Sequence, residues 1–320
     1  MVPGTALAAA LRDEGMEPDL VGLLDAVAAA TERIEALVRR APLTHLVGLT
    51  GETNVQGEAV HKLDAAANQV FVDAVRVSGR VGHLVSEELD EPLGLGGAPF
   101  DLFVDPVDGS SNTDVNGSIA SIFSVRRATG DGLPGPADRQ RAGGYVIYGP
   151  ATAMMITWGA GLHEFVLDPE SRRFVLTRAG LRLPARGRTY AVNSGRQAYW
   201  PPDVRAFFDD LNADDPARDR PYSLRYSGSL TADLHRILLE GGIYCYPADD
   251  RAKDGKLRLL YEACPLALLA EQGGGAASSG RERILDILPR SIHQRVPLFI
   301  GSATEVALAE DYIQHRRAAP

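Results

Sequence analysis

The sequence predicts a mixed α/β fold of the α+β kind, built from two halves. Residues 100–177 contain a run of short apolar stretches separated by Gly and Pro, which is typical of an antiparallel sheet. From about residue 182 the pattern changes, because strand-like and helix-like stretches alternate. A chain of 320 residues has room for about two domains at ~150 residues each. We therefore expect an N-terminal half over 1–181 and a C-terminal half over 182–320.

Apolar spacing predicts the elements of the N-terminal half. Residues 20–40 have a helical pattern, with Asp19 placed to cap the helix. After a turn-rich segment at 48–58, apolar residues from 63 to 74 recur at helical spacing. A buried strand at 100–104 follows, and residues 128–142 have the composition of a surface loop. Further strands are expected at 120–125, 143–149, 153–159, 163–167 and 173–177.

The C-terminal half is expected to alternate strands with helices. Residues 257–274 have a helical composition, with Pro265 expected to kink or break the helix. The Gly-rich segment 273–280 follows this helix, so it indicates a helix cap and loop and not a phosphate loop. The other predicted elements are strands at 189–193 and 242–247 and helices at 203–211 and 231–241, with a last helix from Thr304.

Composition and charge exclude several classes of protein. Hydrophobic residues make up 45% of the chain and charged residues 23%, as in an average globular protein. The formal net charge of −9 argues against a nucleic-acid partner, since phosphate neutralisation requires a basic face. Cys245 and Cys264 are too few for a disulfide framework and favour a cytoplasmic location. We expect no membrane association, because no run of 18 apolar residues and no basic signal-peptide start are present.

The strongest chemical feature is the string DPVDGSSN, which directly follows the apolar strand at 100–104. Asp105 and Asp108 offer the carboxylate oxygens that hard cations prefer. Gly109, Ser110 and Ser111 then offer N–H and hydroxyl donors suited to a phosphate group. A turn in which Asp and Ser cap backbone groups is the structural alternative. The full string favours metal-assisted phosphoryl transfer.

Other acidic residues are weaker candidates. Glu87 and Glu88 follow an apolar stretch, and on an extended segment they would point to opposite sides. A solvated strand end is the alternative for this pair. Glu58 lies in the turn-rich segment, and Asp64 lies beside the helical stripe, where an exposed acid is the default.

Basic and aromatic residues of the C-terminal half offer a second set of candidates. Lys256 and Glu262 are six residues apart, so on a helix they could flank one site, or belong to an ordinary amphipathic helix. Arg225 and Tyr226 precede a helix start at which a second phosphate could be received. No GxSxG or Cys/His arrangement suggests a covalent nucleophile, which favours an attacking water.

The motifs taken together resemble class I fructose-1,6-bisphosphatase. The strings DPVDGSSN, VSEE, KLD and GGIYCYP match in order, as do THLVGLTGETNVQGE and IHQRVPLFIGS. The DPxDGS core is shared with inositol monophosphatases, whereas GKLRLLYEACPLALLAEQGG and RYSGS with TADLHR point to the bisphosphatase branch. The match spans roughly residues 43–305. The resemblance implies a layered α/β/α/β/α sandwich and Mg²⁺-dependent removal of the 1-phosphate of fructose 1,6-bisphosphate.

The resemblance also implies roles for individual residues. Glu88 and Asp64 would position and deprotonate the attacking water, with Glu58 standing where the family has an Asp in a mobile loop. Arg225 would reach the substrate of a neighbouring subunit, which implies a homotetramer or a homodimer. About two or three Mg²⁺, or Mn²⁺ or Zn²⁺ in their place, would be held by carboxylates. The implied metal ligands are Glu87, Asp105, the carbonyl of Val107, Asp108 and Glu262. The implied substrate ligands are Asp108, Gly109, Ser110, Ser111, Asn193, Arg225, Tyr226, Tyr246 and Lys256.

Departures from the family pattern limit what the resemblance implies. The segment MEPDLVGLL replaces the Gly-Glu-x-Thr motif of AMP-inhibited members, although Arg127 matches an AMP-site position, so we expect weak or absent AMP inhibition. Arg196 stands where many relatives have Tyr or Asn, and this extra cation could strengthen binding of the distal phosphate or alter which sugar fits. A sedoheptulose-1,7-bisphosphatase or dual enzyme remains open, as does a non-catalytic sensor of sugar phosphates. The sequence leaves a gluconeogenic and a carbon-fixation role equally open.

Overall fold

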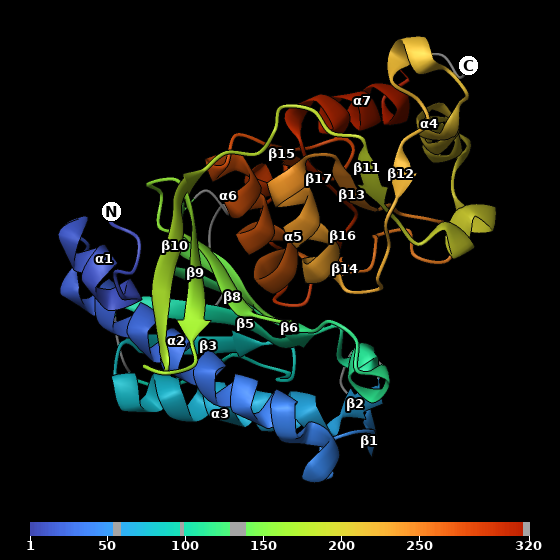
Figure 1. Cartoon of the computed structure of the whole chain (residues 1–320). Helices are drawn as coiled ribbons and strands as arrows, with labels where there is room; N and C mark the ends of the chain where they lie inside the picture. Colours follow the sequence, from blue (N-terminus) through green and yellow to red (C-terminus); the bar gives the residue numbers. More distant parts are fainter. Residues whose placement is uncertain (54–58, 97–98, 129–138, 316–320) are drawn as a thin grey trace.

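The structure is a computed structural model that describes residues 1–53, 59–96, 99–128 and 139–315. Helices and sheets alternate in five layers, two of them sheets (Figure 1). The outer layer of the N-terminal half contains α1 (Leu7–Asp13), α2 (Pro18–Arg40) and α3 (Lys62–Ser78). Helices α5 (Leu230–Glu240) and α6 (Cys264–Gln272) lie between the two sheets, and α4 (Pro202–Asn212) and α7 (Ala303–Ile313) cover the far side of the second sheet. The predicted layered α/β/α/β/α sandwich is therefore confirmed.

The larger sheet has the strand order β10-β9-β8-β7-β6-β5-β3-β4 among the described residues. All neighbouring strands pair antiparallel except β3 and β5, which are parallel. The parallel pair places the ends of β3 and β5 at the same edge, as the candidate site requires. The strands are β3 (Val81–Ser86), β4 (Leu93–Gly94), β5 (Phe100–Asp108), β6 (Ala120–Arg127), β7 (Gln140–Tyr148), β8 (Thr152–Thr157), β9 (Leu162–Asp168) and β10 (Arg173–Leu181).

The smaller sheet has the order β12-β11-β13-β17-β15. Its strands are β11 (Thr189–Ala191), β12 (Ser223–Leu224), β13 (Ile243–Tyr246), β15 (Ala276–Ser278) and β17 (Leu298–Gly301). Two short antiparallel pairs flank the sheets: β1 (Leu49–Thr53) with β2 (Ala59–His61), and β14 (Leu257–Arg258) with β16 (Arg295–Val296).

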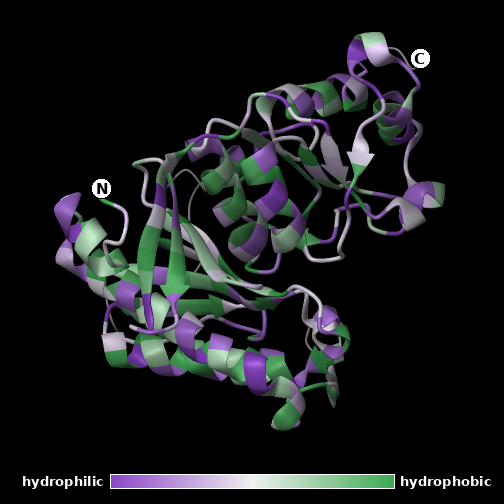
Figure 2. Ribbon diagram, viewed as in Figure 1, coloured by the Kyte–Doolittle hydropathy of each residue, from purple (hydrophilic) through white to green (hydrophobic). Residues whose placement is uncertain are grey.

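Three buried apolar clusters explain the layering. The first joins α1–α3 to one face of the larger sheet, where Val104 and Phe123 are fully buried. The second joins the opposite face to α5, α6 and the smaller sheet, and includes Tyr145 and Ile300. A third packs α4 and α7 on the outer face of the smaller sheet. Figure 2 shows hydrophobic residues concentrated on the strands of the larger sheet. The larger and the smaller sheet are thus each buried on both faces, which explains why a strand segment such as FDLFV has apolar residues on both faces.

Several predicted boundaries differ from the structure. Helix α2 begins at Pro18, so Asp19 lies inside its first turn and the N-cap residue is Glu17, without a side-chain capping bond. Helix α1 was not predicted, because its seven residues carry no capping signal. The segment 273–280 contains strand β15 in addition to a helix end.

Residues 257–274 were expected to be helical, with a kink at Pro265 or a break just after Glu262, and they form three elements. Leu257 and Arg258 are a strand, Leu259–Ala263 form a π-helical turn (η6), and α6 begins only at Cys264. Leu257 pairs with Val296, a partner 39 positions away in the chain, and this non-local pairing overrides the local helical composition.

Among the described residues, no helix is long and apolar enough to cross a membrane. Cys245 and Cys264 are both buried free thiols, and burial raises the pKa of the Cys264 thiol to about 11.

Candidate active site

Strand β5 delivers the two aspartates of the DPVD string. Every residue of the strand is buried, and the strand continues to Asp108, whereas we expected it to end at Val104. Residues three apart on a regular strand point to opposite faces. The register against β6 shifts between Asp105 and Asp108, next to Pro106, which has no N–H to give to the ladder. This irregularity brings both carboxylates to the same side, with Val107 N–H donating to Asp105 Oδ1 at 3.0 Å.

Helix α5 holds Asp108 from the other half of the chain. The Thr231 N–H donates to Asp108 Oδ2 at 2.9 Å, and the Ser229 hydroxyl donates to the same oxygen at 3.2 Å. Ser229 is the N-cap of α5, and its Oγ accepts from Ala232 N–H at 3.3 Å. The first turn of a helix favours a carboxylate, so the start of α5 orients Asp108 as well as stabilising its charge.

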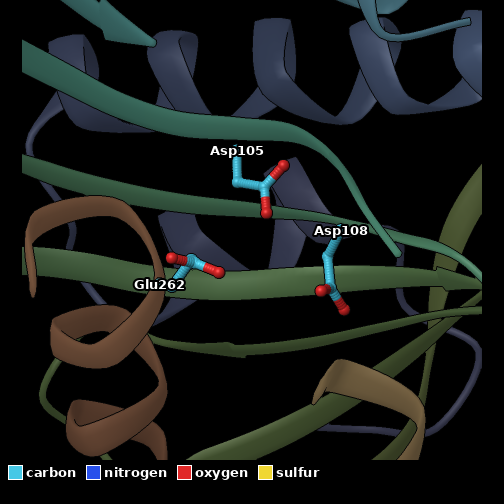
Figure 3. Close-up of side chains that lie close together, drawn as sticks. All are labelled: Asp105, Asp108 and Glu262. Atoms are coloured by element: carbon cyan, nitrogen blue, oxygen red, sulfur yellow. The ribbon is translucent and has the colours of Figure 1, made fainter. Parts of the chain in front are cut away.

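Glu262 completes a cluster of three carboxylates. One oxygen each of Asp105, Asp108 and Glu262 lies within 4.8 Å of the others. Figure 3 shows the three side chains together, with the aspartates on strand β5 and Glu262 on the helical turn facing it. Oxygen-only donors in this number are suited to a hard divalent cation such as Mg²⁺.

Arg258 lies among these acids and was not singled out from the sequence. Its Nη2 contacts Glu87 Oε1, its backbone N–H donates to Glu262 Oε2, and its Nη1 lies 3.8 Å from the same oxygen. The sequence offered one signal for a buried Arg258: it is the only charged residue in the apolar stretch 257–260, and Glu262 follows four residues later. The structure therefore provides one buried cation for a cluster with several acids.

The electrostatics of the cluster are unfavourable without further positive charge. Burial is the largest cause that raises the pKa of Asp105 well above its ordinary value. The negative charges of Glu87, Asp108 and Glu262, in that order, raise it further. Burial raises the pKa of Glu262 to about 8, although Arg258 opposes the shift. Burial also raises the pKa of Asp108. Buried carboxylates that destabilise one another fit a site for divalent metal, whose charge would offset both effects.

Glu87 and Glu88 come directly after β3 and lie in a turn, not on the extended segment that we expected. The Glu87 N–H donates to Val104 O at 3.1 Å, and the Glu88 N–H lies 3.3 Å from Ser86 Oγ. Both side chains line the same cleft as the three clustered acids, so the predicted alternative of a solvated strand end is wrong.

Asp64 is buried, and the default expectation of an exposed helical acid is wrong. It lies in the first turn of α3, where its Oδ2 accepts from His61 N–H at 3.3 Å. Burial, followed by the charge of Glu88, raises the pKa of Asp64 to about 7. A carboxylate that titrates near neutrality is suited to exchanging a proton with water.

One cleft of about 480 Å³ contains nearly all the predicted site residues. Glu58 lies outside the described residues. Arg225 is exposed and does not line the cleft, and its Nη1 donates to Leu224 O at 2.9 Å. Residues that line the cleft without having been assigned from the sequence include Asn112, Gly228, Leu230, Tyr244 and Arg258. The predicted residues in the lining are Asp64, Glu87, Glu88, Asp105, Val107, Asp108, Gly109, Ser110, Ser111, Asn193, Tyr226, Tyr246, Lys256 and Glu262.

Gly109 makes the turn from β5 into the loop that carries Ser110 and Ser111. Its φ of +78° is in the left-handed region, which disfavours other residues. A Cβ at this position would also lie 3.4 Å from Ser118 O and from Ser229 Cβ. Glycine therefore lets the loop pass close to the start of α5 and Asp108.

The lining of the cleft also includes a cation and two phenols. Lys256 lines the cleft with Tyr226 and Tyr246. Burial raises the pKa of Tyr226 to about 12, so this phenol keeps its proton at neutral pH. Arg196 does not supply a further free cation here, contrary to expectation, because Asp249 binds its guanidinium through two hydrogen bonds.

Comparison with known families covers both halves of the chain. A model described as "Fructose-1-6-bisphosphatase, N-terminal domain" matches residues 6–179. A second, described as "Fructose-1-6-bisphosphatase, C-terminal domain", matches residues 183–314.

Individual relatives and solved structures agree with these matches. Class 1 fructose-1,6-bisphosphatase of Synechocystis sp. is 42% identical over 311 residues, which cover 93% of this chain and 88% of the relative. The protein of the same name from Sorangium cellulosum is 46% identical over 307 residues, covering 92% of this chain and 88% of the relative. Leishmania major fructose-1,6-bisphosphatase in holo form superposes with a TM-score of 0.92 at 34% identity, covering 99% of this chain and 100% of the other. With its cleft of clustered carboxylates and with both halves matched, the chain belongs to the class 1 fructose-1,6-bisphosphatase family.

Proposed function

We propose that the protein is a phosphoric monoester hydrolase that removes the 1-phosphate of fructose 1,6-bisphosphate, giving fructose 6-phosphate and inorganic phosphate. The observation that carries this proposal is the cleft itself. Its lining combines the clustered carboxylates of Asp105, Asp108 and Glu262 with the cation of Lys256 and the phenol of Tyr246. A doubly phosphorylated sugar has two anionic ends, one for each of these environments.

Carboxylates of the cleft would hold divalent metal, chiefly Mg²⁺, with Mn²⁺ or Zn²⁺ as alternatives. The ligands would be Glu87, Asp105, Asp108, Glu262 and the carbonyl of Val107. Bound Mg²⁺ supplies charge that lowers the pKa of water and neutralises a leaving alkoxide. The raised pKa values of Asp105 and Glu262 support this assignment, because they indicate acids whose ionised forms need a partner.

Glu88 and Asp64 would position the attacking water and take its proton. Both line the cleft, and the pKa of Asp64, about 7, suits a group that accepts a proton at neutral pH. Glu58, by resemblance, would assist from the segment before α3. The proton taken from the water passes to solvent, and the leaving alkoxide takes up a proton to become the hydroxyl of fructose 6-phosphate. No covalent link between enzyme and phosphate is required.

The remaining residues would bind the sugar bisphosphate. Gly109, Ser110 and Ser111 would donate to the 1-phosphate beside Asp108. The sugar and the distal phosphate would be bound by Asn193, Tyr226, Tyr246 and Lys256.

We propose a homotetramer, or a homodimer, in which Arg225 reaches the distal phosphate in a neighbouring subunit. Its exposed position outside the cleft of its own chain supports this. Light scattering of the purified protein, together with the KM of Arg225→Ala, tests it. A fully active monomer contradicts it.

The experiment that tests the function measures phosphate release from fructose 1,6-bisphosphate, sedoheptulose 1,7-bisphosphate and inositol 1-phosphate, each with Mg²⁺ and with EDTA. We expect Mg²⁺-dependent release that is fastest with fructose 1,6-bisphosphate. Preferential hydrolysis of the seven-carbon sugar would favour the sedoheptulose alternative or a dual enzyme. Binding of substrate without phosphate release would favour a sensor, and the complete set of carboxylates argues against that outcome.

A further inference from the structure

Arg196 and Asp249 form a two-point ion pair next to the distal end of the cleft. Arg196 Nε lies 2.6 Å from Asp249 Oδ2, and Nη2 lies 2.9 Å from Oδ1. The side chain of Asp249 is only 1% exposed and that of Arg196 is 29% exposed. A bidentate pair with a buried carboxylate has a defined geometry and is screened little by salt.

The carboxylate of Asp249 also shapes the segment that leads to Lys256. Its Oδ1 accepts from the N–H groups of Arg251 and Ala252, each at 2.9 Å. The Gly255 N–H then donates to Ala252 O at 3.0 Å, immediately before Lys256. Asp249 therefore organises the turn whose end carries the cation of the cleft.

Arg196 lies in the short helix η4 (Ser194–Tyr199), whose N-cap is Asn193. The Asn193 Oδ1 accepts from Gly195 N–H at 3.1 Å, and its backbone O accepts from Arg196 N–H at 3.1 Å. The Asp250 N–H donates to Tyr199 O at 3.0 Å, which adds a backbone link between the two segments. The ion pair thus joins the segment that begins at Asn193 to the segment that follows Tyr246.

The pair stands directly behind the wall of the cleft. Asn193 and Tyr246 line the cleft, and together with Arg196 and Asp249 they also border a small void of about 10 Å³ on its other side. Asn193 and Tyr246 therefore lie next to both the ion pair and the cleft, and a change in the pair is expected to displace them.

We propose that Arg196 and Asp249 are positioning residues that hold Asn193, Tyr246 and Lys256 at the spacing required by the distal, phosphate-bearing end of the sugar bisphosphate. This inference rests on the proposed function and deepens it. Neither residue of the pair touches substrate; each acts through the wall of the cleft. The pair acts on residues proposed to bind the distal phosphate and not on the clustered acids, so its loss is expected to weaken substrate binding and to leave the chemical step intact.

The test compares Arg196→Met with Arg196→Lys in the full chain with Mg²⁺. For Arg196→Met we expect KM for fructose 1,6-bisphosphate to rise about tenfold while kcat changes less than about twofold. Calorimetry with fructose 6-phosphate, which carries only the distal phosphate, is expected to show a Kd raised by a similar factor. Arg196→Lys keeps the charge but makes a single contact, so an intermediate KM is expected.

The matched control is Arg283→Met. Arg283 makes a similar bidentate pair with Glu271, at 2.8 and 2.6 Å, in the same half of the chain, but neither residue lines the cleft. The KM of Arg283→Met for fructose 1,6-bisphosphate is expected to equal that of the unaltered protein. If Arg196→Met unfolds, Asp249→Asn provides the same comparison with the shape of the side chain preserved.

Three outcomes overturn the inference. These are an unchanged KM and Kd in Arg196→Met and Asp249→Asn, a fall in kcat without a change in KM, and an equal rise of KM in Arg283→Met. Failure of the proposed function is distinguishable, because the unaltered protein would then release no phosphate from fructose 1,6-bisphosphate with Mg²⁺. If the unaltered protein also fails to bind fructose 6-phosphate, the inference falls with the function.

Discussion

Arg258 contacts Glu87 across the candidate metal site, joining a residue of the C-terminal half to one that follows β3. The same arginine contacts Glu262 through its backbone N–H. Burial raises the pKa values of Asp105 and Asp108, and the charge of Arg258 opposes that rise. It is a protein-supplied positive charge in a place where metal charge is also expected. The guanidinium and a metal ion would therefore oppose each other electrostatically.

We predict that Arg258→Met increases the stabilisation that Mg²⁺ gives. Removing a buried cation leaves several carboxylates uncompensated, so the metal-free variant should be less stable by about 3–5 kcal/mol. Without the positive charge of Arg258, the carboxylates attract a divalent ion more strongly. Thermal unfolding of both proteins, with EDTA and over a Mg²⁺ titration, measures the difference. A smaller Mg²⁺-induced rise in melting temperature in Arg258→Met than in the unaltered protein would contradict the prediction, and Arg258→Lys is the charge-preserving control.

Asp108→Asn is predicted to abolish turnover while the fold survives. The amide oxygen can still accept from Thr231 N–H, so the contact with α5 persists, but one negative charge of the metal site is lost. We expect kcat to fall by a factor of about 100 or more. Phosphate release and circular dichroism are the measurements. Glu91→Gln, the same chemical change at an exposed acid after Glu88, is the control and should be fully active. Near-normal phosphate release from Asp108→Asn would remove this residue from the site.

The metal-free protein is predicted to lose stability as the pH rises through neutrality. The pKa of Asp64 is raised to about 7 and that of Glu262 to about 8, in each case mainly by burial. An acid with a raised folded pKa binds more protons when folded, so the free energy of unfolding falls between the unfolded value of about 4 and the folded value.

Melting temperatures with EDTA should therefore decrease from about pH 5 to pH 8. Saturating Mg²⁺ should remove much of this dependence, because carboxylates that bind metal stay ionised. In EDTA, Asp64→Asn should have a flatter profile than the unaltered protein. A melting temperature that rises over this pH range without metal would show that these acids are not protonated in the folded protein.

AMP is predicted not to inhibit the enzyme at micromolar concentration. The Arg127 Nη2 lies 2.7 and 2.6 Å from the two carboxylate oxygens of Glu17, and Arg141 lies 3.5 Å from one of them. The arginine that matches an AMP-site position is thus already paired with a carboxylate at the start of α2. Phosphate release should be measured over an AMP titration at constant free Mg²⁺, because AMP also binds the metal. Half-maximal inhibition in the micromolar range would refute the prediction.

The local sequence was sufficient to predict those elements and motifs that depend only on residues close together in the chain. The DPVDGSSN string, the strand before it and the helix that begins near Leu63 were all found from spacing and residue type. The resemblance then supplied the roles that spacing could not, such as those of Asn193 and Tyr246, which are far from the acids in sequence.

Features created by contacts between distant segments could not be derived from local patterns. Glu262 lies beside Asp105 and Asp108, and only the family resemblance grouped the three acids. The pairing of Leu257 with Val296, close to Glu262 in the chain, has no local signal in the sequence. Arg196 looked like a free cation, since its partner Asp249 is 53 positions away and belongs to another segment. The raised pKa of Asp64 likewise has causes outside its own helix, because burial and then the charge of Glu88 produce it.

The hydrogen bond from Thr231 to Asp108 links the start of α5 to the end of β5, and so links one half of the chain to the other through a carboxylate of the candidate metal site. A shift of one sheet relative to the other would displace that carboxylate. The affinity for metal would then depend on the relative orientation of the sheets. By thermodynamic linkage the converse also holds: any molecule that alters this orientation must change the affinity for metal by the same factor as metal changes the affinity for that molecule. A regulator of this fold would therefore not have to contact the substrate. It would only have to change the relative orientation of the two sheets.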